Sequence, residues 1–405
     1  MSNGMAIPQG LSPQNELRAT FLIYLAGFTY HIGLGATLIL VPLYALHLGF
    51  DLDELGMIVA SQAVLGLFLR LIAGALSDRF GERWVLLISF ATMALGAAII
   101  GIASTFWPLI LGQTLLGISR ATYWTATQSY CSRINPSKAG ILLGRMSSSR
   151  TSGEMVGALF AGLVAELLGY GVAWSMLTVL GLSGVIGSLA LPLLPRKQDQ
   201  RGFTQVLAPI PSMMKSPSMV MAGFTAFVAS AAMAIPVILL VPYLRELGNG
   251  ETLVGFIRTA GLVGSVGIGI IFGRIVARTG QKNLYVLALF FMGIVMLLFL
   301  FSGTALIAMG LLMLAHGTLY GLLGPLYPLT AATYSSQEER GIAMAYVGLY
   351  WGIAQIIVPA AFGLLASNIG LKDSFWVASA MFFGFALLMP ILFPILTNKW
   401  HRDKA

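Results

Sequence analysis

Two opposite charges, Glu154 and Arg120, lie inside long apolar stretches of the sequence. Glu154 falls a third to a half of the way along the stretch 141–166, and Arg120 lies near the middle of the stretch 107–131. Either charge alone in lipid would cost ~3 kcal/mol or more, so each needs a partner or water. A carboxylate that gains and loses an arginine neighbour can bind and release a proton. The pair is therefore a candidate for proton coupling, and a static ion pair between two helices is the alternative.

Two histidines, His31 and His316, also fall near the middle of apolar stretches. Because the ordinary pKa of imidazole is ~6.5, each could exchange a proton, although a hydrogen bond between helices explains each one equally well. Arg150 lies one helical turn before Glu154 and competes for it. The candidate proton-coupling residues are Glu154, Arg120, His31 and His316. The sequence contains no metal-ligand spacing, serine nucleophile elbow or phosphate-binding loop, so we expect no enzyme activity, no metal and no cofactor.

The composition indicates an all-α integral membrane protein. Hydrophobic residues make up 57% of the 405 residues and charged residues 9%, whereas a soluble domain has about 25% charged residues. A helix of about 20 apolar residues crosses the bilayer, and the sequence predicts twelve such spans. They run over 19–45, 55–76, 84–104, 107–131, 141–166, 173–194, 218–244, 252–273, 284–302, 304–333, 342–367 and 374–397.

The distribution of lysine and arginine predicts how these spans are oriented. With the N-terminus inside, nearly all basic residues fall at cytoplasmic ends, and outer ends hold only Arg245, Arg258 and Lys372. This bias predicts a cell-membrane protein with both termini in the cytoplasm. It also accounts for the net charge of +8 without nucleic acid. We expect Arg258 to extend outward and pair with Glu251 or Glu246.

Internal repeats divide the chain into two halves. Leu40-Val41-Pro42 recurs as Leu240-Val241-Pro242, and Gly140-Ile141 recurs as Gly341-Ile342. Such repeats indicate two pseudo-symmetric six-helix bundles with a binding site between them. We expect an N-terminal bundle over 1–194, a cytoplasmic linker over 195–217 and a C-terminal bundle over 218–405. At the repeat-equivalent position Glu154 becomes Gln355, so the second half lacks this charge.

A short charged segment, Gly74-Ala75-Leu76-Ser77-Asp78-Arg79-Phe80-Gly81-Glu82-Arg83, separates the second and third spans. We expect a ten-residue link here, with a positive φ at Gly81. The pattern G-x-L-x-D-R-x-G-x-R resembles the loop between helices two and three of the major facilitator superfamily, and a degenerate copy spans 273–282. The resemblance implies a conformational role for Gly74, Asp78, Arg79, Gly81 and Arg83.

The fifth span resembles a motif of the proton-coupled drug antiporters of that superfamily. Gly144, Gly153 and Gly157 match G-x8-G-x3-G-P-x2-G-G, but Ala158 and Ala161 replace the proline and one glycine. The spaced glycines give a smooth face for a neighbouring helix, and ordinary small-residue packing is the alternative. The arginine that this branch carries in span four is replaced by Gln113.

The resemblance implies a secondary transporter that works by alternating access. We expect proton-coupled efflux of small hydrophobic or amphipathic compounds; the alternatives are a proton-linked uptake carrier for a sugar, organic acid or other metabolite, and a receptor or scaffold without flux. The expected partners are a small-molecule substrate, protons and the bilayer, with no nucleic acid, and the chain is expected to be a monomer. The expected cavity residues are Tyr30, His31, Arg120, Tyr123, Trp124, Glu154, His316, Tyr320, Tyr327 and Gln355. Ordinary packing against lipid is the alternative for the aromatic ones.

Overall fold

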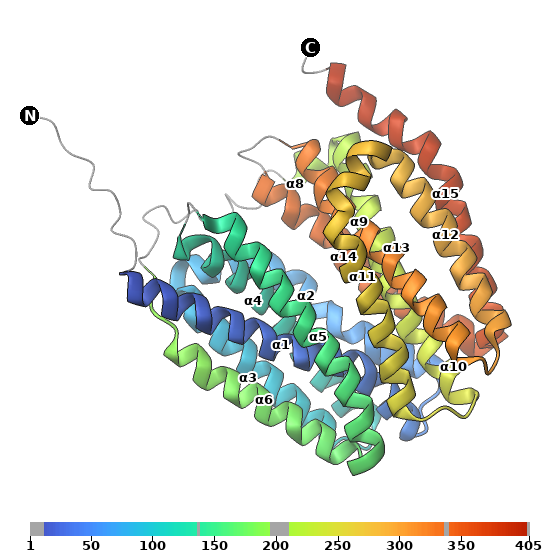
Figure 1. Cartoon of the computed structure of the whole chain (residues 1–405), viewed down its shortest axis with the longest axis horizontal. Coiled ribbons are helices and arrows are strands. Elements are labelled where there is room, and N and C mark those ends of the chain that lie inside the picture. Colours follow the sequence, from blue (N-terminus) through green and yellow to red (C-terminus); the bar gives the residue numbers. More distant parts are fainter. Residues whose placement is uncertain (1–11, 136–137, 195–209, 336–339, 403–405) are drawn as a thin grey trace, which may run out of the picture.

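The computed structural model describes residues 12–135, 138–194, 210–335 and 340–402, and every regular element in them is helical. Long helices occupy the twelve predicted spans, in two groups of six (Figure 1). The first group is α1 (Pro13–His47), α2 (Leu52–Phe80), α3 (Glu82–Gly101), α4 (Phe106–Ile134), α5 (Ala139–Leu168) and α6 (Tyr170–Ala190). The second group is α9 (Pro217–Ile238) with α10 (Leu240–Glu246), α11 (Glu251–Thr279), α12 (Gln281–Ser302), α13 (Leu306–Thr333), α14 (Arg340–Ile369) and α15 (Leu371–Arg402).

Two of these spans depart from a simple apolar helix. The seventh is broken at Leu239 into α9 and α10, three residues after Pro236, because proline has no N–H to donate within a helix. The fourth, α4, is the one long helix absent from the eleven that are apolar enough to cross a membrane by composition. Gln113, Ser119 and Arg120 contribute to its polarity. Neighbouring helices α2 and α3 pack against it, so these polar groups lie inside the protein.

The same packing is repeated in both halves, as the internal repeats predict. In the first bundle α1 packs on α5, α2 on α4, and α3 on both α4 and α6. In the second bundle α9 packs on α14, α11 on α13, and α12 on both α13 and α15. Three pairs of glycines with positive φ follow the repeat, namely Gly49 and Gly248, Gly81 and Gly280, and Gly169 and Gly370. The predicted fold of two pseudo-symmetric six-helix bundles is confirmed.

The charged link between the second and third spans is much shorter than predicted. Instead of ten residues, helix α2 continues to Phe80 and α3 begins at Glu82, with Gly81 alone between them. Gly81 has a φ of 90°, as expected, and Gly280 repeats this turn between α11 and α12 with a φ of 77°. Residues 74–80 are helical because the reversal needs only one residue with positive φ, which glycine adopts without steric cost.

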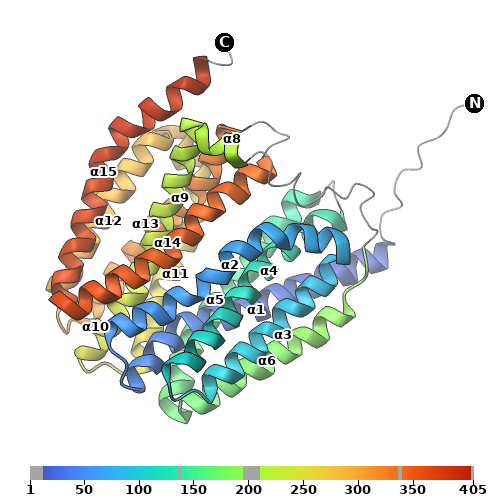
Figure 2. The same ribbon diagram turned by 180° about the vertical axis from the view of Figure 1, so that it is seen from behind.

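Two pairs of helices join the bundles, α2 with α14 and α5 with α11. At each contact, glycine lets two backbones approach. A Cβ on Gly56 would collide with the carbonyl of Pro359, and one on Gly162 would collide with that of Glu251. The bundles converge toward the end where α10 lies and diverge toward the end with both termini, as Figures 1 and 2 show. We call the latter the terminal end.

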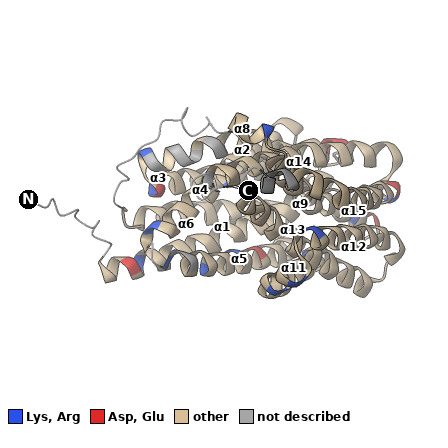
Figure 3. Cartoon of the chain, turned by 90° about the horizontal axis from the view of Figure 1, so that it is seen from above, with Lys and Arg blue, Asp and Glu red and all other residues tan. Residues whose placement is uncertain are grey.

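Charged side chains are sparse along the helices and gather near helix ends (Figure 3). At the terminal end, Arg274 and Arg278 are exposed near the end of α11, and Lys282 is exposed at the start of α12. The opposite end carries acidic residues, including Asp51 and Asp53. The outer surface of both bundles is apolar, with exposed side chains such as Phe21, Phe68, Ile270, Phe301 and Leu387. Such a surface suits contact with lipid rather than water.

Candidate functional site

Arg150 lies inside the N-terminal bundle, held by α1 and α4. Its guanidinium carbon is 3.4 Å from the centroid of the Trp124 ring, and its Nε lies 3.2 Å from Nε2 of His31. Gly153, less than one turn further along α5, lets α5 approach the backbone of Phe28 in α1. The glycine face of α5 therefore brings Arg150 to both partners. A cation stacked on an indole in a poorly hydrated place is stabilised by the ring quadrupole.

The hydrogen bonds of His31 determine its tautomer. Arginine has no acceptor, so Nε2 of His31 accepts from Arg150, and Nδ1 carries the proton that it donates to the Gly27 carbonyl at 2.9 Å. His31 is therefore neutral in this arrangement. Behind it, Tyr30 stacks on Tyr123 with ring centroids 3.7 Å apart. These rings hold His31, and through it Arg150, in place.

Glu154 is half-buried on α5 and forms no ion pair or hydrogen bond with any described residue. Helices α5 and α11 run antiparallel where Ala158 meets Gly255 and Gly162 meets Glu251. One turn back along α5, this register places Glu154 opposite residues 258–259 of α11. The register thus brings Arg258 opposite Glu154, where α5 faces the second bundle.

Arg258 does not pair with Glu251 or Glu246, contrary to the expectation from the sequence. Glu251 instead pairs with Arg245 at 3.0 Å and accepts from Tyr170 at 2.9 Å. Arg258 is half-buried about two turns further along α11. It lies inward because the arginine nearer the loop already satisfies Glu251.

Arg120 and Glu154 are not paired with each other among the described residues. Nη1 of Arg120 lies 3.4 Å from the side-chain oxygen of Gln62, and Nη2 lies 4.0 Å from Sδ of Met233. Because Met233 belongs to α9, Arg120 reaches across to the other bundle. The hydroxyl of Tyr320 points to the same sulfur at 3.6 Å. Met233 therefore receives a donor from each bundle.

A small pocket next to Arg120 opens between α2, α4 and α14. Gln355 forms part of its wall and donates to the hydroxyl of Ser230 at 2.9 Å. Its lining residues are Gln62, Ala63, Gly66, Leu67, Gly117, Arg120, Ala121, Trp351, Gly352 and Gln355. The repeat partner of Glu154 is thus a hydrogen-bonded side chain on the wall of this pocket.

The other expected cavity residues fall into two groups. Tyr30, His31, Tyr123 and His316 are buried in the bundle interiors, each at most 3% exposed, so none forms a cavity wall in this conformation. Nε2 of His316 donates to the Ala232 carbonyl at 3.0 Å. Trp124, Glu154, Arg120, Tyr320, Tyr327 and Gln355 are half-buried. Tyr327 lies against Trp351 with ring centroids 5.2 Å apart, on the bundle opposite Arg150.

The expected conformational residues also separate by environment. A Cβ on Gly157 would collide with the carbonyl of Ile32, so this glycine and Gly153 set the close approach of α1 and α5. A Cβ added to Gly144 would have no atom within 4 Å, so this glycine sets no close helix contact. Arg79 and Arg83 lie over the rings of the residues that follow them, Phe80 and Trp84. The side chain of Asp78 and the environment of Gly74 lie outside the described part, so their roles stay predictions.

The sequence did not predict the contacts of two charged residues. It placed Arg150 one turn before Glu154 and in competition for it, but it gave no sign of the contacts with His31 and Trp124 that the structure forms. Glu82 is buried next to the α2–α3 turn, where it pairs with Arg133 and accepts from Ser129 at 2.7 Å. Glu82 and Arg133 lie far apart in the sequence and on different helices, so their pairing could not be predicted from the sequence.

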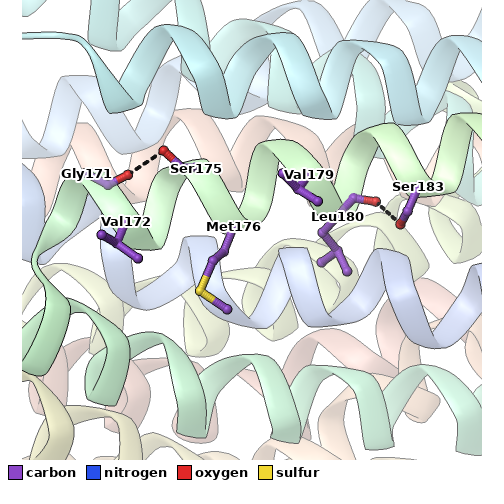
Figure 4. Close-up of a pocket in the computed structure, with 7 residues that line it drawn as sticks. All are labelled: Gly171, Val172, Ser175, Met176, Val179, Leu180 and Ser183. Carbon is purple, nitrogen blue, oxygen red and sulfur yellow. Dashed lines mark hydrogen bonds between the residues drawn. The ribbon is translucent and has the colours of Figure 1, made fainter.

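A second pocket lies on the surface of α6 (Figure 4). It is lined by Gly171, Val172, Ser175, Met176, Val179, Leu180 and Ser183. Ser175 and Ser183 donate to carbonyls of their own helix, and Met176 and Val179 are largely exposed. This groove offers little polar chemistry, and lipid chains can fill it.

Comparison with known proteins places this arrangement in a family. The family model described as "Major Facilitator Superfamily" matches residues 23–233 and 221–402. The "Multidrug resistance protein MdtG" of Escherichia coli (strain K12 / DH10B) is 24% identical over 316 residues, which cover 76% of each protein. The fold resembles the nucleoside transporter NupG, with a TM-score of 0.78 and 14% identity over 93% of this chain and 99% of that one. It also resembles a D-xylose–proton symporter, with a TM-score of 0.74 and 16% identity over 92% of this chain and 97% of the other. The chain therefore belongs to the major facilitator superfamily, and it is a multi-pass membrane transporter rather than an enzyme.

Proposed function

We propose that the protein couples proton movement to the export of small hydrophobic or amphipathic compounds by alternating access. The observation that carries this proposal is Glu154, a half-buried carboxylate between the bundles without an ion-pair partner among the described residues. A carboxylate held within a membrane span is costly, so it marks a functional site. The similarity to MdtG and the glycine face of α5 favour efflux over uptake.

The proposed orientation places both termini in the cytoplasm. Exposed basic residues cluster at the terminal end, including Arg274, Arg278 and Lys282, while acidic residues lie opposite. Membrane proteins keep their lysine and arginine on the cytoplasmic side. The bundles diverge at that end in Figures 1 and 2, and we propose that this is the end that opens to the cytoplasm. We propose a monomer in the cell membrane, with the N-terminal bundle within 1–194 and the C-terminal bundle within 218–405.

Uptake of a polar metabolite with a proton is the second candidate. The pocket between α2, α4 and α14 presents Gln62, Arg120 and Gln355, and a sugar or organic acid would need several such hydrogen-bonding groups. The two functions differ in the direction of coupling. In a symporter the substrate crosses the membrane in the same direction as the proton, and in an antiporter it crosses in the opposite direction.

Flux in proteoliposomes tests the proposal. Purified full-length protein is reconstituted, and a panel of anionic, neutral and cationic amphipathic dyes, together with labelled sugars and nucleosides, is offered outside. Accumulation of a dye only when the lumen is acidic supports antiport. Accumulation of a sugar or nucleoside only when the lumen is alkaline supports the second candidate. Absence of any gradient-dependent flux contradicts both.

A further inference from the structure

We propose that the transported molecule carries an anionic group, which binds the guanidinium of Arg150 while an apolar body extends toward α13 and α14. This inference rests on the proposed transport function and specifies its substrate class, an amphipathic organic anion. Its first support is a charge imbalance between the bundles. Arg120, Arg150 and Arg258 are all half-buried in this region, whereas Glu154 is the one carboxylate identified there among the described residues. Cations inside a membrane protein need a counter-charge or water.

The position of Arg150 is suited to an anion. Nε of Arg150 donates to Nε2 of His31 at 3.2 Å, and Trp124 covers one face of the guanidinium. Neither partner uses Nη1 or Nη2, and Arg150 forms no ion pair with any described residue. Two parallel N–H groups at a fixed angle match the two oxygens of a carboxylate, and also suit a sulfonate or phosphonate. The guanidinium is thus oriented before the ligand arrives.

Trp124 supplies a further donor. Its Nε1–H is buried and has no acceptor among the described residues. A buried N–H without a partner costs ~1–3 kcal/mol, so an acceptor supplied by the ligand would relieve a penalty already present. Because the same indole lies under Arg150, one anionic group can contact both side chains. His31 is a positioning residue here, since it contacts Arg150.

The opposite bundle offers the apolar part of the site. Tyr327 of α13 packs its ring against Trp351 of α14. Both rings belong to the second bundle, whereas Arg150 belongs to the first. A ligand that contacts both would bridge the bundles, which alternating access requires of a substrate.

Equilibrium binding to the detergent-solubilised full chain tests this proposal without a proton gradient. The probes are radiolabelled naphthalene-2-carboxylate, naphthalene-2-sulfonate and the neutral naphthalene-2-carboxamide. We expect the two acids to bind at least about ten-fold more tightly than the amide, and Arg150→Gln to remove this difference. Arg150→Lys should keep part of this preference for acids, because the ammonium keeps the positive charge but lacks the two parallel N–H donors of the guanidinium. The matched control Arg278→Gln, at the exposed terminal end, should bind like the original protein.

The proposal is overturned if neither acid binds, if the amide binds as tightly, or if Arg150→Gln keeps the preference for acids. Should Arg150→Gln fail to fold, as judged by size exclusion and melting, Trp124→Phe replaces it. That variant keeps a ring under the guanidinium and removes Nε1–H, so the acids should lose affinity several-fold. Equal affinities for the acids in Trp124→Phe and the original protein would then overturn the proposal. Binding of the acids without gradient-driven flux would contradict proton coupling and leave the anion site supported.

Discussion

Arg150 donates a hydrogen bond to His31, and this contact requires that the imidazole be neutral. A proton added to Nε2 would replace an acceptor with a donor and place two cations 3.2 Å apart. His31 therefore cannot accept a proton in this conformation unless Arg150 moves away. Glu154, one turn after Arg150 on α5, forms no hydrogen bond with a described residue that an added proton would break, and we therefore propose it as the proton carrier.

Replacing Glu154 with glutamine should mimic the permanently protonated state. We expect gradient-driven accumulation in proteoliposomes to stop, while exchange of substrate across the membrane without a gradient continues. The matched control is Glu166→Gln, because Glu166 is exposed and accepts from the backbone of Thr252 at 2.7 Å. Full gradient-driven accumulation in Glu154→Gln would show that the proton binds elsewhere, with His31 or His316 next in line.

Arg258 should be needed for transport, because the register of α5 and α11 places it opposite Glu154. We expect Arg258→Gln to lower the initial rate of gradient-driven flux several-fold, and Arg274→Gln, exposed near the terminal end of α11, to leave it unchanged. If Arg258 acts through Glu154, the two substitutions will not be additive. An unchanged rate in Arg258→Gln would return this residue to the peripheral role predicted from the sequence.

The contact between α1 and α5 should tolerate no side chain at Gly157. A valine there would drive its branched Cβ into the Ile32 carbonyl, so the helices must separate. We expect a loss of about 1–3 kcal/mol in stability, seen as a lower melting temperature of the purified protein. Gly144→Val provides the comparison, because no atom lies within 4 Å of a Cβ at Gly144. Equal melting temperatures for the two variants would show that α1 and α5 are not closely packed.

Removing one charge of the Glu82–Arg133 pair should be costly. The side chain of Glu82 is 3% exposed, so Glu82→Gln removes a buried charge that both Arg133 and Ser129 contact and should cost about 3 kcal/mol or more. Glu16→Gln is the control, since Lys138 in its ion pair is 59% exposed and such pairs contribute little. Chemical or thermal unfolding in detergent measures both. Similar stabilities for the two variants would contradict a structural role for Glu82.

The fold could be predicted from the sequence because lipid imposes simple rules on it. Apolar stretches long enough to span the bilayer became helices, and the repeated Leu-Val-Pro and glycine positions indicated two similar bundles. The α2–α3 link was predicted too long because charged residues such as Asp78 and Arg79 suggested a loop, whereas a helix end at the membrane surface accommodates them as well.

The site could be predicted only in part, because its contacts depend on helix rotation. The sequence identified Glu154 and Arg120 as costly charges, but their depth alone suggested a pair that the structure does not form. Arg120 turns instead to Gln62 and to Met233 of the other bundle. Arg150 was identified as a competitor for Glu154, but its contacts with His31 and Trp124 depend on how α1, α4 and α5 pack and could not be predicted.

The glycines that join the bundles also bear on the speed of the transport cycle. At Gly56, Gly162, Gly255 and Gly363 the facing surfaces are backbone against backbone, and no side chains interlock at these points. Interlocked side chains would have to change rotamer, one after another, before two helices could part. We therefore expect these glycines to lower the barrier for separating α2 from α14 and α5 from α11. The side-chain hydrogen bonds that cross between the bundles beside them, from Tyr170 to Glu251 and from the Thr252 backbone to Glu166, would then be the contacts that the transport cycle has to break.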